Sequence, residues 1–438
     1  MITLERLCFI DLFAGIGGLR LGFELAAHSL GFSTQCVLAS DIDPDAQMVY
    51  EMNFGHKPLG DVCLIDKLPK HDVLLAGFPC QPFSYAGKKG GFGDTRGTLF
   101  FEIMRLVDTA PPKALIFENV RGLFTHDGGR TFSTIKHEVT KRGYSFNAFL
   151  LNSVHFGLPQ NRVRVYIIGI LGGNPEFGLI SDTGPRDTHA CRFDQLCLFD
   201  QCNKAVKVAD ILEDNVDPKY DCSPEFVEAL KKVLGGDLSK LHGVRLIDYR
   251  GGNSIHSWEL GLRGECSQEE IALMNSFITE RRKKKFGRHQ DGKLLTKEQI
   301  ASFFPHPELD KILDSLVQKR YIQVINGKYK PVAGNFSFEV YKFLDPEKIS
   351  VTLVASDANR IGIYHNGRVR RITPREAARL QGFPEDFKLH PEDDKAYYQL
   401  GNAVSVNVVE AVAKEAILNG YFQELISAQA GDKEVVNL

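Results

Sequence analysis

The chain has 438 residues, which is more than one ordinary hydrophobic core accommodates, so two or three domains are expected. Apolar residues make up 43% and charged residues 25%, proportions typical of a soluble globular protein. No apolar run is long enough to span a membrane, and the first residues lack a signal-peptide pattern, so a cytoplasmic location is expected. The net charge of −2 gives no general attraction to nucleic acid, which makes any DNA contact depend on local basic patches.

Nine cysteines are scattered along the chain without a paired framework. A cluster of four, with His189 beside it, consists of Cys191, Cys197, Cys202 and Cys222. No two of these cysteines have the C-x-x-C spacing typical of structural zinc sites. We therefore expect free thiols and no metal, with a zinc site at this cluster as the disfavoured alternative.

Residues 1–171 form the first expected domain, because short apolar runs alternate there with helix-like stretches. This alternation predicts an α/β fold with a doubly wound, mostly parallel sheet. The expected strands are Leu7 to Phe13, Val37 to Ser40, Asp72 to Ala76, Ala114 to Phe117, Ser145 to Leu151 and Val163 to Ile170. The expected helices are Leu19 to Ala27, Pro44 to Asn53 and Thr98 to Thr109.

Residues 172–355 form a smaller, irregular second domain in which this alternation is lost. Within it, residues 296–331 predict a winged-helix-like insert. Thr296 can cap a helix through Phe303, and Pro307 to Lys319 has apolar residues at helical spacing. Two strands, Tyr321 to Val324 and Lys328 to Lys330, are joined through Asn326-Gly327 as a hairpin. Winged-helix modules bind DNA or protein, so the role of the insert stays open.

Residues 356–438 form the third expected segment. Thr373 can cap a helix from Pro374 to Leu380, and Val404 to Leu418 has the composition of a longer apolar helix.

A glycine-rich turn follows the first strand, in the segment Asp11 to Gly18. Glycines at a helix start let the backbone approach a ligand closely, but Arg20 stands where the dinucleotide fingerprint has its third glycine. By itself the segment is equally a tight strand-to-helix turn. The second strand ends in Asp41, which can accept hydrogen bonds from ribose hydroxyls, whereas Asp43 before Pro44 suits a helix cap. Together with the later Gly60-Asp61-Val62, these segments predict a nucleoside cofactor.

Cys80 follows the third strand directly, in the segment Gly77-Phe78-Pro79-Cys80-Gln81-Pro82. Ligands of open α/β sheets bind beyond the carboxyl ends of the strands, and a cysteine between two prolines there is stiffly held and accessible. A buried structural cysteine is the commoner alternative. The segment Gly87 to Gly97 predicts a mobile basic loop that closes over a substrate.

Two further strand ends carry groups suited to catalysis. Glu118 ends the fourth strand, where partial desolvation can raise its pKa and let it act as an acid. Arg162 and Arg164 share one face of a later strand and suit a phosphate or a base carbonyl. A plain strand-end carboxylate and a surface arginine pair are the alternatives.

These segments, in this order, resemble the DNA (cytosine-5) methyltransferase family of bacterial restriction–modification systems. The glycine turn, Pro79-Cys80, Glu118-Asn119-Val120 and the run Gln160 to Arg164 occur in the family's order, as do Arg371 to Pro384 and Gly401-Asn402-Ala403-Val404. The resemblance covers about residues 6–170 and 365–415, roughly half of the chain.

The resemblance implies S-adenosyl-L-methionine as the methyl donor, and it implies that the last helix packs beside the first sheet to complete the pocket. One departure is Ile42, which stands where an aromatic residue often stacks on adenine. The cofactor-binding residues implied are Phe13, Gly15, Gly17, Asp41, Ile42, Asp61, Val62, Asn402 and Val404.

The resemblance also implies roles in the chemistry. The Cys80 thiolate adds to carbon 6 of cytosine and activates carbon 5. Glu118 protonates or hydrogen-bonds N3, Arg164 holds the O2 carbonyl, and Arg162 supports the loop or a phosphate. Because carbon 6 is unreachable inside a stacked duplex, the base must be flipped out.

The middle region corresponds to the family's target-recognition domain, so the expected partner is double-stranded DNA, bound by a monomer. The run Arg281 to Lys285 either tracks phosphates or is a solvated linker. Thr352-Leu353 resembles a short signature near the end of that domain. The expected DNA-contacting residues are Gln81, Ser84, Lys88, Lys89, Arg96, Arg250 and Thr352.

Three alternatives remain at this point. A tRNA methyltransferase of the same family usually has a smaller recognition region than this chain. A binding protein that has lost catalysis is disfavoured by the intact Cys80, Glu118 and Arg164. A cysteine hydrolase is disfavoured because no histidine accompanies Cys80 in a motif, His71 lying before the strand.

Overall fold

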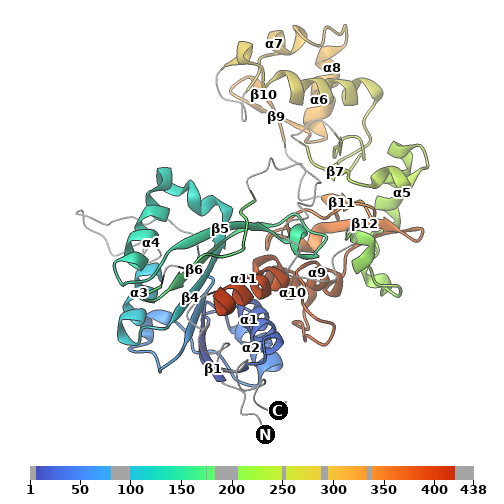
Figure 1. Cartoon of the computed structure of the whole chain (residues 1–438). Helices are drawn as coiled ribbons and strands as arrows, with labels where there is room; N and C mark the ends of the chain where they lie inside the picture. Colours follow the sequence, from blue (N-terminus) through green and yellow to red (C-terminus); the bar gives the residue numbers. More distant parts are fainter. Residues whose placement is uncertain are drawn as a thin grey trace, which may run out of the picture. The chain divides into compact units, whose positions relative to one another are not determined.

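The computed structural model describes residues 6–79, 99–173, 175–182, 206–248, 253–287, 294–332 and 338–419 (Figure 1). The chain divides into two compact units. Unit 1 consists of Met1–Leu212, Ile349–Ala358 and Pro374–Leu438, and unit 2 of Glu213–Lys348 and Asn359–Thr373. The limits near the expected boundary after residue 355 differ because the strands within Asn359–Thr373 pair in the sheet of unit 2. The first segment of unit 1 also extends beyond the expected boundary after residue 171, to Leu212.

A six-stranded mixed sheet forms the centre of unit 1, with strand order β2-β1-β3-β4-β6-β5. The first four strands in this order are parallel, whereas β6 runs antiparallel to both β4 and β5. The six expected strands are confirmed, with small differences at their ends. The strands are β1 (Arg6–Leu12), β2 (Ser33–Ser40), β3 (Val73–Ala76), β4 (Ala114–Val120), β5 (Asn147–Asn152) and β6 (Val163–Ile170).

Helices cover both faces of this sheet, and each face has its own apolar core (Figure 1). One core joins the sheet to α1 (Gly18–Ser29) and α11 (Val406–Asn419), which lie side by side. The other joins it to α3 (Leu99–Thr109) and α4 (Arg130–Thr140). Further helices of unit 1 are α2 (Pro44–Phe54), α9 (Pro374–Leu380) and α10 (Asp393–Asn402). The α/β class is therefore confirmed, with a mixed sheet.

Unit 2 contains a second sheet, with strand order β13-β12-β11-β7-β8. Its strands are β7 (Arg245–Leu246), β8 (Ser254–Ile255), β11 (Lys342–Leu344), β12 (Ile361–His365) and β13 (Arg368–Arg371). Helix α5 (Pro224–Leu234) buries Phe226 and Leu230 in the core of this sheet.

The insert of unit 2 has a separate core around Trp258. Its elements are α6 (Gln268–Glu280), α7 (Lys297–Ala301), α8 (Leu309–Gln318), β9 (Ile322–Ile325) and β10 (Lys328–Pro331). The expected helices and hairpin are confirmed, and both residues of the Asn326-Gly327 turn have positive φ, at 49° and 72°. This small core begins earlier than residue 296, because α6 and Trp258 contribute to it. The winged-helix assignment itself stays a prediction.

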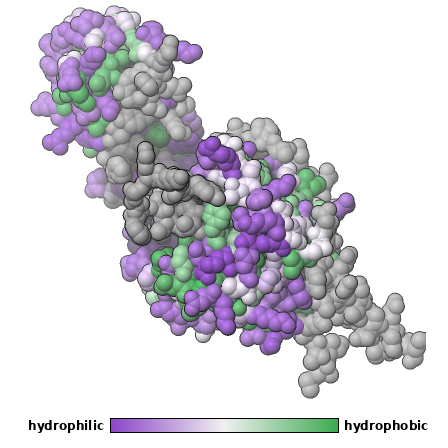
Figure 2. Space-filling view, turned by 90° about the vertical axis from the view of Figure 1, so that its left-hand side faces the viewer, coloured by the Kyte–Doolittle hydropathy of each residue, from purple (hydrophilic) through white to green (hydrophobic). Residues whose placement is uncertain are grey.

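Exposed apolar side chains on the described surface are scattered, as on ordinary globular proteins. On the face drawn in Figure 2, hydrophilic and hydrophobic residues are interspersed. None of the helices in the described ranges has the length and apolar character needed to cross a bilayer.

Candidate active site

The turn between β1 and α1 has an unusual backbone. Phe13, Gly15 and Gly17 have φ of 55°, 53° and 90°, in the left-handed region that glycine adopts without cost. Gly17 caps the start of α1, and a Cβ there would approach Phe54 Cε2 to 2.2 Å. The backbone of Gly17 must therefore stay bare, which explains the glycine spacing.

Asp41, at the end of β2, holds this turn. Its Oδ2 accepts a hydrogen bond from the Gly15 N–H at 2.7 Å, and its Oδ1 accepts one from the Asp43 N–H at 2.8 Å. Burial raises the pKa of the Asp41 carboxyl, although these two N–H groups oppose the shift. Asp43 instead caps α2 by accepting from the Asp45 N–H, which confirms the capping interpretation.

Glu118 and Arg164 form an ion pair across the β4–β6 ladder. Their Oε1 and Nε atoms are 3.3 Å apart, and their side chains are 12% and 15% exposed. Burial raises the pKa of Glu118, and the Arg164 guanidinium only partly offsets this. Beside the pair, the Asn119 side-chain amide donates to the Phe78 carbonyl at 2.8 Å. That bond fixes the segment that leads directly into Cys80.

Arg162 has different partners, although it lies two residues from Arg164. Its guanidinium donates to the carbonyls of Leu353 at 2.8 Å, Ala403 at 2.6 Å and Gly401 at 3.4 Å. The residue is buried, and burial lowers its pKa to about 9. The structure therefore assigns most of the hydrogen-bonding capacity of Arg162 to holding backbone.

Gln160 is the first residue of the motif that ends at Arg164, and the motif alone predicted no role for it. Its side chain donates to the Leu380 carbonyl at 2.8 Å and accepts from the Leu353 N–H at 2.9 Å. The Thr352 hydroxyl donates to the Asn161 carbonyl at 2.6 Å. Gln160 and Thr352 therefore tie the segment Ile349–Ala358 to the start of β6.

These groups surround one cavity of about 400 Å³ within unit 1. Its walls come from the glycine turn, the ends of β2, β3 and β4, the start of β6 and the end of α10. Eight predicted site residues line it: Phe13, Gly15, Asp41, Glu118, Arg162, Arg164, Asn402 and Val404. Eight of the residues predicted from the sequence therefore lie around a single pocket.

Four predicted cofactor residues do not line the cavity. Gly17 belongs to the turn but packs on Phe54, and the Ile42 side chain is 73% exposed. Asp61 caps the 3-10 helix η1 (Val62–Leu64) by accepting from the Cys63 N–H, and Val62 is buried in the core with β1 and β3. Seven further predicted residues lie outside the described ranges: Cys80, Gln81, Ser84, Lys88, Lys89, Arg96 and Arg250.

Several lining residues were not anticipated. Tyr398, Gln399 and Gly401 come from α10, which has no motif of its own upstream of Gly401. A Cβ at Gly401 would lie 2.4 Å from the Ala355 nitrogen, so this glycine is a signal from which a close backbone contact could have been inferred. Gln381 was part of the quoted motif, and its side chain donates to the Leu400 carbonyl at 2.9 Å.

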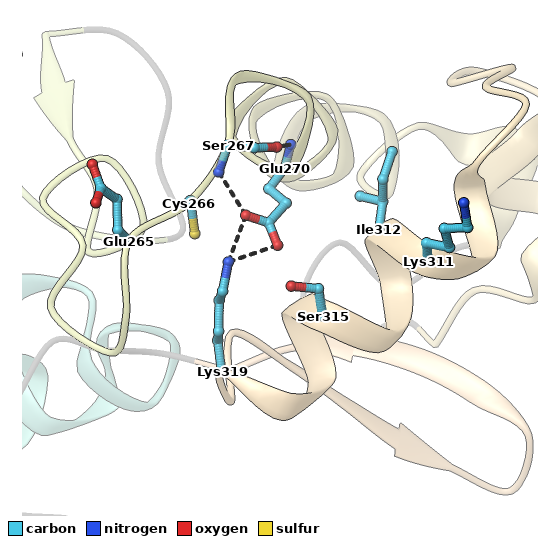
Figure 3. Close-up of a pocket in the computed structure, with 8 residues that line it drawn as sticks. All are labelled: Glu265, Cys266, Ser267, Glu270, Lys311, Ile312, Ser315 and Lys319. Carbon is cyan, nitrogen blue, oxygen red and sulfur yellow. Dashed lines mark hydrogen bonds and ion pairs between the residues drawn. The ribbon is translucent and has the colours of Figure 1, made fainter.

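A second, shallower cavity lies in unit 2 between α6 and α8 (Figure 3). Both Glu270 carboxylate oxygens accept from the Lys319 ammonium, at 2.8 and 2.7 Å, and one also accepts from the Ser267 N–H. Because these groups satisfy one another, the cavity offers little for a ligand. Among the described residues no group of His, Cys, Asp and Glu could hold a metal ion. Cys191, Cys197 and Cys202 lie outside those ranges, and Cys222 is buried.

The profile of the C-5 cytosine-specific DNA methylase family matches residues 7–418. The chain belongs to this family. Relatives include the Type II methyltransferase M.BanI of Aneurinibacillus aneurinilyticus, 54% identical over 99% of this chain and 100% of the relative. The Type II methyltransferase M.HgiCI of Herpetosiphon aurantiacus is 58% identical over 92% of this chain and 96% of its own length.

Solved structures agree at the level of the fold. A putative DNA modification methyltransferase encoded within a prophage of E. coli superposes with a TM-score of 0.52 and 22% identity, over 94% of this chain and 99% of that chain. The S. pombe Dnmt2 methyltransferase superposes with a TM-score of 0.51 and 18% identity, over 94% and 98%.

This member of the C-5 cytosine-specific DNA methylase family is a C-5 cytosine DNA methyltransferase of the restriction–modification type. The high identity to Type II methyltransferases over nearly the whole chain favours DNA over the tRNA alternative. It also removes the reason to consider a cysteine hydrolase.

Proposed function

We propose that the chain transfers a methyl group from S-adenosyl-L-methionine to carbon 5 of a flipped-out cytosine in duplex DNA, through a covalent bond to Cys80. The observation that carries the proposal is the Glu118–Arg164 pair in the same cavity as the glycine turn. Pro79, which also lines that cavity, precedes Cys80 directly. The proposed acid and cation thus share one pocket, and the proposed nucleophile directly follows in sequence a residue that lines it.

The cavity fits a nucleoside cofactor. The bare backbone of the glycine turn allows close approach, and the Asp41 carboxylate at the cavity edge is held in place by two N–H groups while its remaining lone pairs can accept from ribose hydroxyls. Phe13, Leu19 and Val404 offer apolar surface for a base. S-adenosyl-L-methionine, when bound, supplies an electrophilic methyl group.

The protein groups then activate the cytosine. The Cys80 thiolate adds to carbon 6, a C–S bond forms, and electron density moves towards carbon 5 and N3. Glu118 is suited to protonate N3, because burial raises its pKa and favours the protonated carboxyl. Arg164 holds the O2 carbonyl and stabilises the developing charge. Methylation of carbon 5 leaves S-adenosylhomocysteine. A water molecule then takes the carbon 5 proton, the C–S bond breaks to release the Cys80 thiolate, and N3 returns its proton to Glu118.

The remaining proposed roles concern DNA. We propose that the basic loop residues Lys88, Lys89 and Arg96, with Gln81 and Ser84, contact the DNA around the flipped base. Arg250 is a proposed DNA contact of the recognition region, for which a winged-helix-like insert is also proposed. Thr352, whose segment Ile349–Ala358 belongs to unit 1, is a further proposed DNA contact. The enzyme is proposed to act as a monomer, which sedimentation of the purified protein with and without duplex DNA would test.

The experiment that tests the mechanism uses duplex DNA containing 5-fluorocytosine with the cofactor present. Carbon 5 then has no proton to lose, so a denaturation-resistant protein–DNA adduct is expected with the wild type. Cys80→Ser should give no adduct and no methyl transfer to ordinary duplex DNA while still binding it. Cys266→Ser, at a partly exposed cysteine of unit 2, is the matched control and should behave as the wild type. Normal turnover by Cys80→Ser would refute the mechanism.

A further inference from the structure

Arg20 lies behind the glycine turn and does not line the cavity. Its guanidinium carbon is 4.1 Å from the ring centroid of Phe54 and 5.4 Å from that of Tyr50. Its Nε donates to Glu24 Oε1 at 2.9 Å, and its Nη1 donates to the Tyr50 hydroxyl at 3.3 Å. The Arg20 side chain is only 11% exposed, so these contacts form in a largely desolvated place.

The Phe54 ring connects Arg20 to the turn. The virtual Cβ of Gly17 lies 2.2 Å from Phe54 Cε2 and 2.8 Å from Phe54 Cζ, so the ring packs directly on the backbone of Gly17. Arg20 therefore holds the ring that touches the turn.

Phe54 is also supported by the C-terminal part of unit 1. The rings of Phe54 and Phe387 meet edge to face, with centroids 6.4 Å apart. Next to them, the Asn53 side chain donates to the Lys388 carbonyl at 2.9 Å and accepts from the Lys388 N–H at 2.8 Å. These contacts hold the Phe54 ring in place, so the glycine turn that packs on this ring has little freedom to move.

The turn needs such support because its own bonds are few. The Ala14 N–H donates to the Ser40 carbonyl at 3.0 Å, the Gly17 N–H to the Ala14 carbonyl at 2.8 Å, and the Gly15 N–H to Asp41. Phe13, a non-glycine residue with a φ of 55°, is strained as well. A strained backbone with few hydrogen bonds keeps a single conformation only where neighbouring groups hold it in place.

An arginine suits this place better than a lysine. Its planar cation stacks on an aromatic ring while its edge donates to Glu24 and Tyr50 at the same time. This also explains why Arg20 stands where a dinucleotide fingerprint has its third glycine: the position supports an aromatic ring here and does not need a close helix–strand contact.

We propose that Arg20 is a positioning residue for cofactor binding, acting through Phe54 to hold the glycine turn in its binding shape. The inference rests on the proposed function, in that the cavity is taken to bind S-adenosyl-L-methionine. Arg20 touches neither cofactor nor substrate. Its loss should therefore weaken binding of the cofactor and leave the chemical step intact once the pocket is filled.

The test compares Arg20→Met, Arg20→Lys and Phe54→Leu with the wild type. Binding of S-adenosylhomocysteine, the demethylated product, is measured by isothermal titration calorimetry on the full chain. Arg20→Met and Phe54→Leu should bind roughly tenfold more weakly, the loss expected from a desolvated cation–π contact. Arg20→Lys, which keeps the charge without the planar stack, should lie between. The KM for S-adenosyl-L-methionine should rise in parallel, with kcat at saturation within about threefold of the wild type.

Arg142→Met is the matched control. Arg142 is also a largely buried arginine of unit 1, with a side chain 17% exposed and ion pairs to Asp108 and Glu138. Its loss should lower thermal stability without changing S-adenosylhomocysteine affinity. The inference is overturned if folded Arg20→Met or Arg20→Lys binds S-adenosylhomocysteine as tightly as the wild type, or if Arg142→Met weakens binding equally. Failure of the wild type to bind it would instead refute the proposed cofactor.

Discussion

Asp11 makes the stability of unit 1 depend on pH in a direction opposite to that of most aspartates. It lies on β1, fully buried, and neither carboxylate oxygen makes a hydrogen bond of ordinary geometry. Burial raises its pKa to about 8, and the Arg20 guanidinium only partly opposes this. Near neutral pH the folded protein therefore holds a proton on Asp11 that the unfolded chain, with an aspartate pKa of about 3.9, has released.

The free energy of unfolding consequently contains a contribution that is fully present below about pH 4 and is lost as the pH rises through about 8. Within that window the slope is about 1.4 kcal/mol per pH unit. Asp11→Asn places a neutral group of the same shape in the same position and cannot titrate. From about pH 5 to pH 7, the variant should gain about 2.7 kcal/mol relative to the wild type. For a unit of this size that corresponds to a relative rise in Tm of roughly 5–10 °C.

Circular dichroism melts at several pH values between about 5 and 7 measure this difference. Asp108→Asn is the control: the Arg142 guanidinium holds the pKa of Asp108 below its usual range, so the group is ionised in both states throughout this window. The Tm difference between that variant and the wild type should not change with pH. If the Tm of Asp11→Asn follows the wild-type pH dependence in parallel, Asp11 is not protonated in the folded protein and the reasoning is wrong.

Three further predictions concern the cavity and the backbone around it. Glu118→Gln should lower kcat by roughly 100- to 10,000-fold in a methyl-transfer assay, because the amide cannot give up a proton to N3. Its affinity for S-adenosylhomocysteine should stay within about threefold of the wild type. A variant with wild-type kcat would contradict the acid role of Glu118. Gly401→Ala should lower the unfolding free energy by ~1–3 kcal/mol in urea denaturation, because the added Cβ would lie 2.4 Å from the backbone of Ala355, whereas Gly60→Ala meets nothing within 4 Å and should change it little. Gln160→Met should cost ~2–4 kcal/mol by the same measurement, because it leaves two buried backbone partners unpaired; a loss below that of Gly60→Ala would refute its anchoring role.

The fold of unit 1 could be predicted largely from local patterns. Its strands are short apolar runs separated by capped helices, and such runs can satisfy their burial only in a covered sheet. β6 was expected from Val163 to Ile170 and has these bounds. Its antiparallel direction was not predictable, because an apolar run has the same composition whichever way it points.

Unit 2 was harder for a physical reason. β7 and β8 contain two residues each, too few to show a period, and β12 follows β11 in the sheet only after the chain has left unit 2 and returned. Sequence order therefore placed residues 359–373 with the C-terminal segment, whereas pairing places them in unit 2. The hairpin of the insert was predictable, because Asn326-Gly327 fixes its turn geometry locally.

For the cavity too, local sequence patterns predict some features, whereas contacts between distant residues determine others. Alternation predicts one face for Arg162, which directly precedes β6, and Arg164 within it, and both residues line the same cavity. Their different roles depend on hydrogen-bond and ion-pair partners, which the alternation of residues along a strand does not predict. Arg162 donates to the carbonyls of Leu353 and Ala403, which lie 191 and 241 residues further along the chain. Arg164 instead forms an ion pair with Glu118. The Arg162 guanidinium already donates to backbone carbonyls, so it is poorly placed to stabilise charge that develops on the base. The Arg164 guanidinium faces Glu118, a carboxyl group that can gain or lose a proton, so it is well placed to stabilise that charge. The proposed chemistry is therefore assigned to Arg164, and Arg162 is the residue that keeps the wall of the pocket in position.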